Sequence, residues 1–99
     1  MQVKINSVHF KADKRLTDFI NEKVGKLSNH FEGVIGSDIT LKVENTDEPA
    51  NKIAEIRLII PGNDLYAKKQ CKTFEEATDS AVDALRRQIN KHKSKLRPH

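Results

Sequence analysis

Hydrophobic and polar positions follow a period of two through the middle of the chain. The segment 38–45, DITLKVEN, alternates strictly between aliphatic and polar residues, and the segment 52–61, KIAEIRLIIP, repeats the alternation. This period is typical of β-strands that bury one face and expose the other to water. The segment 65–72, LYAKKQCK, continues the pattern after the turn sequence PGND. We therefore expect three consecutive strands joined as an antiparallel meander.

The beginning of the chain combines a strand with a helix. The segment 2–10, QVKINSVHF, is rich in β-branched residues, and its alternation changes phase near Ser7. This predicts a strand that shifts face or bulges at that point. Asp13 then offers an N-cap for a helix over roughly 13–30. Its apolar residues recur at the three-and-four spacing of an amphipathic helix: Leu16, Phe19, Ile20, Val24, Leu27 and Phe31.

A second, longer helix is predicted near the end of the chain. Thr73 and Glu76 have the spacing of a capping box, in which side chains satisfy the free backbone N–H groups at a helix start. Phe74 opens the helix, and Pro98 ends any helical continuation. The apolar stripe of this helix consists of Phe74, Ala77, Ala81, Val82, Leu85, Ile89 and Leu96.

The predicted order β-α-β-β-β-α indicates an α+β fold. A right-handed crossover through the first helix makes the first two strands parallel, and the remaining neighbours are antiparallel. Because the strands alternate cleanly, both helices are expected to cover one face of a four-stranded mixed sheet, leaving the other face to water. The expected core consists of Leu16, Phe19, Ile20, Leu27, Ile39, Leu41, Ile56, Leu58, Phe74, Leu85 and Ile89.

Length and composition restrict the class of protein. A chain of 99 residues supports one core, so we expect a single domain over 1–99. The longest aliphatic run, LII at 58–60, is far too short to span a membrane, and the start lacks the apolar segment of a signal peptide. Cys71 is the only cysteine, so no internal disulfide forms, which favours a reducing, cytoplasmic location without membrane association.

Charge is distributed unevenly along the chain. Lys and Arg number 18 against 14 Asp and Glu, but no acid follows Asp83, so the end of the chain, 84–99, is basic throughout. Cations near a helix C-terminus complement the macrodipole, which is the simpler explanation. The dipole acts only over the last turn, however, whereas the basic residues run from Arg86 to Arg97, a rise of about 17 Å if helical. A tract of this length favours phosphate, since each contact releases counterions.

The two predicted helices place cations beside their buried stripes. On the first helix, Lys23 and Lys26 share a row with Phe19, and Lys23 projects near the stripe itself. Its methylene stem could simply pack there while its ammonium reaches water, which is as consistent with the sequence as an RNA contact. The candidate RNA-binding residues from these rows are Lys23, Lys26, Arg86, Arg87, Lys91 and Lys93.

Catalytic and metal-binding patterns are missing from the sequence. The four histidines are scattered singly, and no nucleophile motif or glycine-rich phosphate loop occurs. We therefore expect no enzyme activity, no metal, no cofactor and no small-molecule substrate. Tyr66 is the one aromatic residue among lysines, so reading of unpaired bases by stacking is not favoured. Recognition of RNA shape and backbone fits better.

Motifs on both predicted helices carry a family resemblance. The ending DALRRQINKHKSKLRPH is similar to a pattern of Leu, Arg, Gln, an apolar residue and a Lys-rich KHK.KL, and the first helix contains LTDFINEKVGKLSNHF. The strand LKVEN and the opening MQVKI agree as well. Over essentially its whole length, the chain resembles the ribosome hibernation promoting factor family, with its relative the ribosome-associated translation inhibitor.

The resemblance implies a fold related to double-stranded-RNA-binding domains, with two parallel helices on one side of the sheet. It also implies binding to small-subunit ribosomal RNA in the decoding channel, on the path of messenger RNA and of A- and P-site transfer RNA, with translation inhibited in stationary phase or stress. By resemblance, the family's basic positions fall on Lys23, Lys26, Arg87, Lys91 and Lys95, with Lys93 as an addition.

Two departures and two rival functions accompany the resemblance. Ala84 stands where a family lysine is usual, and Arg86 where its neighbour is often neutral. Long family members continue into a dimer-forming second domain, whereas this sequence stops at His99, so we expect a monomer that does not pair ribosomes by itself. The rivals are a general double-stranded-RNA-binding module and a regulator whose basic helix binds an acidic protein.

Overall fold

The computed structural model describes residues 2–29, 31 and 33–96, with side chains described as far as His92 in the last helix. The element order matches the predicted β-α-β-β-β-α, with one short 3₁₀ turn, η1, added after the first helix. The elements are β1 (Gln2–Ser7), α1 (Lys14–Gly25), η1 (Lys26–Asn29), β2 (Gly36–Val43), β3 (Lys52–Ile60), β4 (Asn63–Cys71) and α2 (Phe74–Leu96).

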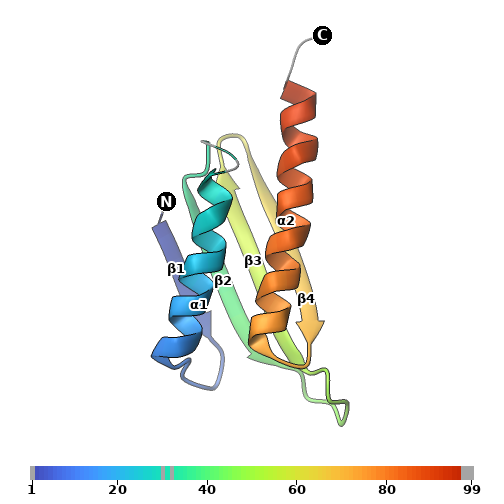
Figure 1. Cartoon of the computed structure of the whole chain (residues 1–99). Helices are drawn as coiled ribbons and strands as arrows, with labels where there is room; N and C mark the ends of the chain where they lie inside the picture. The colour runs from blue at the N-terminus through green and yellow to red at the C-terminus, as the bar shows by residue number, and fades with distance from the viewer. Residues whose placement is uncertain (1, 30, 32, 97–99) are drawn as a thin grey trace.

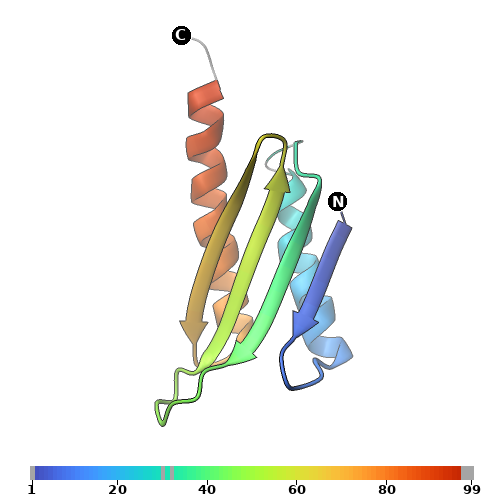
Figure 2. The ribbon, with the colours of Figure 1, turned by 180° about the vertical axis from the view of Figure 1, so that it is seen from behind.

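The four strands form one mixed sheet in the order β1-β2-β3-β4. β1 and β2 are parallel, and the other two pairs are antiparallel, as the crossover and meander predicted. One row of residues crosses the whole sheet in register: Ile5 lies opposite Ile39, Ile39 opposite Ile56, and Ile56 opposite Ala67. Both helices cover this side of the sheet and run in the same direction (Figure 1), while the opposite side is open (Figure 2).

Side-chain caps begin both helices at the predicted residues. An Asp13 Oδ1 oxygen accepts a hydrogen bond from the Leu16 N–H at 2.8 Å. The Thr73 hydroxyl accepts one from the Glu76 N–H at 3.0 Å. Each bond satisfies a backbone donor that has no partner within the first helical turn. The first helix ends earlier than expected, because Lys26–Asn29 tightens into η1 rather than continuing the α-helix.

The core forms between the sheet and the two helices and contains nearly all the expected residues. Its buried members come from every element except β1, whose Val3 and Ile5 pack at its edge. Phe74 is only partly buried, and its ring stacks on Phe10 with centroids 4.9 Å apart. The prediction for Phe19 was wrong. Phe19 is half-buried on the flank of α1, because the turns that face the sheet present Leu16, Ile20 and Val24 instead.

The change of phase near Ser7 marks the end of β1. The backbone pairs with β2 through Ser7, and the Val8 N–H still donates to the Leu41 carbonyl at 2.9 Å. His9 then adopts a positive φ of 63°, a conformation uncommon for residues other than glycine. The expected bulge is therefore a turn, and it returns the chain so that Phe10 can pack against Phe74.

The second helix extends past the end of the sheet. α2 has 23 residues, which corresponds to a length of about 34 Å. Its last turns project beyond the strands in both views (Figures 1 and 2), so the molecule is elongated, with extents of 50 × 25 × 19 Å. This projecting end belongs to the basic part of the chain. Within the described ranges, neither helix combines the length and apolar character needed to cross a membrane.

Candidate nucleic-acid interface

The facing flanks of α1 and α2 are joined by a charged pair. The Lys23 ammonium lies 3.4 Å from a carboxylate oxygen of Asp79 and 5.6 Å from the centre of the Phe19 ring. The Lys23 side chain is only 33% exposed. The methylene stem of Lys23 therefore packs on the apolar flank of α1, as the simpler interpretation predicted. Its ammonium pairs with the Asp79 carboxylate on α2.

Lys26 lies beyond Lys23 on the same flank of the first helix. Its ammonium is 3.9 Å from a Glu22 carboxylate oxygen, and its side chain is 54% exposed. Exposed pairs at this spacing contribute little to stability, because water screens them and both side chains lose freedom. Lys26 is therefore available to exchange its carboxylate partner for a phosphate.

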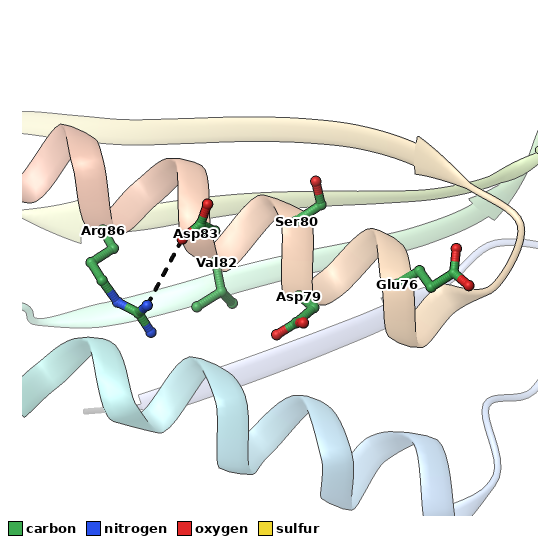
Figure 3. A pocket seen from close by; sticks show the side chains of 6 residues that line it. All are labelled: Glu76, Asp79, Ser80, Val82, Asp83 and Arg86. Atoms are coloured by element: carbon green, nitrogen blue, oxygen red, sulfur yellow. Dashed lines mark ion pairs between the residues drawn. The ribbon is translucent and has the colours of Figure 1, made fainter.

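Arg86 approaches the same flank from α2. Figure 3 shows its side chain extending toward α1, with an ion pair to Asp83 at 3.8 Å. The Arg86 Nε atom is buried and finds no hydrogen-bond partner among the described residues. A guanidinium presents several donors in a fixed plane, so the ion pair that Nη1 makes with Asp83 leaves the buried Nε donor unpaired. Lys23, Lys26 and Arg86 therefore lie on the neighbouring flanks of α1 and α2, each beside a carboxylate.

Arg87 and Lys91 face a different direction from Arg86. The Arg87 side chain is 77% exposed and donates to the second oxygen of Asp83. Lys91 is exposed, one turn further, beside a shallow pocket that Asn63 and Gln88 also line. The predicted cations therefore divide between the interhelical groove and the outer side of α2. Lys93 and Lys95 belong to the helix, but their side chains, like Arg97, lie outside the described residues.

Sequence reasoning missed that acids lie beside these cations. A hollow along the exposed surface of α2 is lined by Glu76, Asp79 and Asp83, together with Arg86 (Figure 3). These acids could be interpreted from the sequence only as charges favourable near a helix start. The spacings of four and three that join Asp79, Asp83 and Arg86 were a visible signal that they share one side of the helix. Only the packing of α1 shows that Asp79 meets Lys23.

The open face of the sheet carries a separate polar cluster. Tyr66 is 48% exposed, and its hydroxyl donates to Glu55 at 2.9 Å. Lys42 and Lys68 also approach this carboxylate, at 3.5 and 3.8 Å. Desolvation by burial, and then the hydrogen bond to Glu55, raises the pKa of Tyr66 above its ordinary value. The phenol is therefore neutral at physiological pH and already engaged, and the cluster ties β2, β3 and β4 together.

Comparisons with known proteins agree with this fold. Residues 3–97 match the family described as "Sigma 54 modulation protein / S30EA ribosomal protein". The chain is 32% identical over 95 residues to "Ribosome hibernation promoting factor" of Pseudomonas putida KT2440, covering 96% of this chain and 89% of that one. The protein of that name from Klebsiella oxytoca is 31% identical over 99 residues, with 100% of both chains covered.

A solved structure shows the same arrangement of elements. The structure titled "ribosomal subunit interface protein from Coxiella burnetii" superposes with a TM-score of 0.83 and 15% identity, covering 95% of this chain and 99% of that chain. At this identity the likeness concerns the fold alone. It confirms the predicted α+β architecture of a four-stranded mixed sheet with two helices.

Proposed function

The chain belongs to the sigma 54 modulation protein / S30EA ribosomal protein family, and from this premise we propose that it is a ribosome hibernation factor. In this proposal it is a binding protein without catalytic activity. It inhibits translation by occupying RNA of the small ribosomal subunit in the decoding channel, during stationary phase or stress. It acts in the cytoplasm, where ribosomes translate, and is a monomer when free.

One observation carries this proposal beyond the family: cations extend from α1 onto the second half of α2. Lys23, Lys26 and Arg86 flank the groove between the helices, and Arg87 and Lys91 continue on the outer side of α2. Phosphate neutralisation by such cations supplies affinity, while the rigid fold sets the geometry of the contacts. The domain proposed for this role is the single unit over 1–99.

The proposed mechanism is exclusion by occupancy. A ribosome that holds this domain on the path of messenger RNA and of A- and P-site transfer RNA has no room for those ligands. Recognition rests on the shape and backbone of folded RNA, because the one strongly exposed aromatic ring among the described residues, Tyr66, lies on the open sheet face and is bonded to Glu55. No bond is made or broken in this mechanism.

Sedimentation with purified ribosomal subunits tests the proposal. We expect the protein to travel with the small subunit at one copy each, to leave the large subunit unbound, and to be displaced by transfer RNA in proportion to its concentration. Binding that a short generic RNA duplex removes as readily as transfer RNA would favour a general double-stranded-RNA-binding module. Failure to bind small subunits, together with capture by an acidic protein, would favour the regulator.

A further inference from the structure

A seam between α2 and β4 forms one long side of the molecule. The Gln88 side-chain amide donates a hydrogen bond to the Tyr66 carbonyl at 2.8 Å, which ties the middle of α2 to β4, the last strand of the sheet. A shallow hollow beside this bond is lined from both elements, by Asn63 and Leu65 of β4 and by Lys91 of α2. Lys91 therefore lies on the seam.

Two lysines follow the same seam toward the start of α2. β4 and α2 run in opposite directions (Figure 1), so the end of the strand lies beside the first half of the helix. Lys69 lies opposite Ala54 of β3, which is completely buried beneath the helices. Lys69 therefore belongs to the helix-covered side of the sheet, and yet it is exposed. Lys72, which directly follows β4, is exposed as well.

The side of α2 along the seam continues this row of charge. Four residues recur at spacings of four, three and four and therefore form one row on the helix: Ser80, Ala84, Arg87 and Lys91. The two small residues of this row lie beside the end of β4, which agrees with the exposure of Lys69. From Lys72 through Lys69 and Arg87 to Lys91, the cations extend over about 25 Å.

Local structure disfavours both lysines. The helix-covered side of a strand normally carries apolar residues, as Leu65 and Ala67 do, so Lys69 interrupts the alternation of β4. Lys72 immediately precedes Thr73, the cap of α2, where a cation opposes the helix macrodipole. Neither the packing of the sheet nor the start of the helix therefore accounts for a positive charge at these two positions.

The lysines of the seam also lack the acid partners that accompany other candidate cations. Lys23 and Arg86 each lie beside a carboxylate. Over the part of the chain that the structure describes, no ion pair includes Lys69, Lys72 or Lys91. A phosphate can therefore neutralise these three charges without breaking an existing ion pair, and each contact releases counterions.

We propose that the seam between β4 and α2 is a phosphate-binding strip, in which Lys69 and Lys72 contact RNA together with Arg87 and Lys91. A polyanionic backbone matches a row of cations of this length, because successive phosphates can each neutralise one of them. Contacts of this kind position the RNA without reading its bases. This inference rests on the proposed function, since it extends the RNA-facing surface from the second half of α2 to the end of β4.

Adjacent lysines of β4 provide a matched test. Lys69→Gln is compared with Lys68→Gln, which removes the same charge one residue earlier but on the open face, where Lys68 is 50% exposed beside Glu55. A double variant, Lys69→Gln with Lys72→Gln, removes both new contacts. Each protein is titrated at several salt concentrations against purified small subunits and against an RNA duplex of about 16 base pairs.

Only the variants on the seam should lose affinity. Lys69→Gln should weaken small-subunit binding roughly three- to tenfold at about 0.1 M salt and flatten the log–log salt dependence by roughly 0.7 to 0.9, since one phosphate is no longer neutralised. The double variant should flatten it by roughly 1.4 to 1.8. Lys68→Gln should change affinity less than about twofold. The melting temperatures of all variants should agree within about 4 °C, because exposed cations contribute little to folding.

Two results would overturn the inference. Equal effects of Lys69→Gln and Lys68→Gln would mean that net charge alone matters. Wild-type affinity and slope in Lys69→Gln would remove the strip from the RNA-facing surface, and self-association of that variant would then assign Lys69 to protecting the edge of β4 from pairing. Failure of the wild type to bind small subunits would contradict the proposed function instead, and the same comparison on the duplex would then decide whether the strip binds phosphates.

Discussion

The first and second halves of α2 share one apolar stripe but carry opposite charges. Ala77 and Ala81 in the first half, and Leu85 and Ile89 in the second, are all completely buried against the core. On the exposed side, the acids of the first half end at Asp83 and the cations begin at Arg86. The proposed function therefore assigns folding and RNA recognition to different sides of one helix. A change on the buried side should alter stability, and a change on the exposed side should alter binding.

The largest effect should come from the buried side of the basic half. Leu85→Ala should lower the free energy of unfolding by about 2–5 kcal/mol, because a fully buried leucine leaves a cavity that the neighbouring residues fill only in part. Denaturant unfolding measures this loss. Arg86→Gln, one residue away, should change stability far less. Similar losses of stability in the two variants would show that folding does not depend mainly on the buried side of α2.

A smaller effect, on binding alone, is expected from the outer side of the same half. Arg87→Gln with Lys91→Gln should weaken small-subunit binding and flatten its log–log salt dependence by roughly 1.4 to 1.8, since two phosphates are no longer neutralised. Each substitution should change stability by less than about 0.5 kcal/mol. Lys11→Gln with Lys14→Gln removes the same charge around the start of α1 and serves as the control. If the Arg87/Lys91 variant bound small subunits with the wild-type affinity and salt dependence, the RNA-facing surface would have to lie elsewhere on the molecule.

The cap of the acidic half should show the reverse behaviour. Thr73→Ala removes the hydroxyl that accepts from the Glu76 N–H, and should cost about 1 kcal/mol of stability. Thermal unfolding detects the loss, while small-subunit affinity below the transition should equal that of the wild type. Thr73→Ser retains the hydroxyl and should retain the stability. Reduced binding by a folded Thr73→Ala protein would connect the first turn of α2 to recognition.

The smallest effect should come from the pair that joins the two helices. A double-mutant cycle of Lys23→Gln and Asp79→Asn should give a coupling energy below about 1 kcal/mol, because Asp79 is largely exposed and the pair is screened. The cycle is read from denaturant unfolding of the four proteins. A coupling well above that value would make Lys23 chiefly a structural contact and would weaken its assignment to RNA.

Local patterns in the sequence predicted most of the fold, because each depends on neighbours along the chain. The strict alternation around Ile39 and Ile56, and the caps at Asp13 and Thr73, all appear where expected. Phe19 shows the limit of such reasoning. Its spacing fits the apolar stripe of α1, but the stripe is wider than the surface that the sheet can cover, so one edge remains half-buried beside Lys23.

For the candidate site, too, some features follow from neighbours along the chain and others only from the packing of distant segments. The basic residues on both helices, and their rows, could be identified from the sequence, since charge and helical spacing are local properties. The sequence by itself thus determined the elements, their order and the basic residues that are candidates for RNA binding. Only the tertiary structure decided that Lys23 meets Asp79, that Arg86 turns toward α1, and that Arg87 and Lys91 face outward. Those contacts depend on how two helices that are far apart in the chain pack on one sheet. The spacing of residues within a single helix does not reveal that packing.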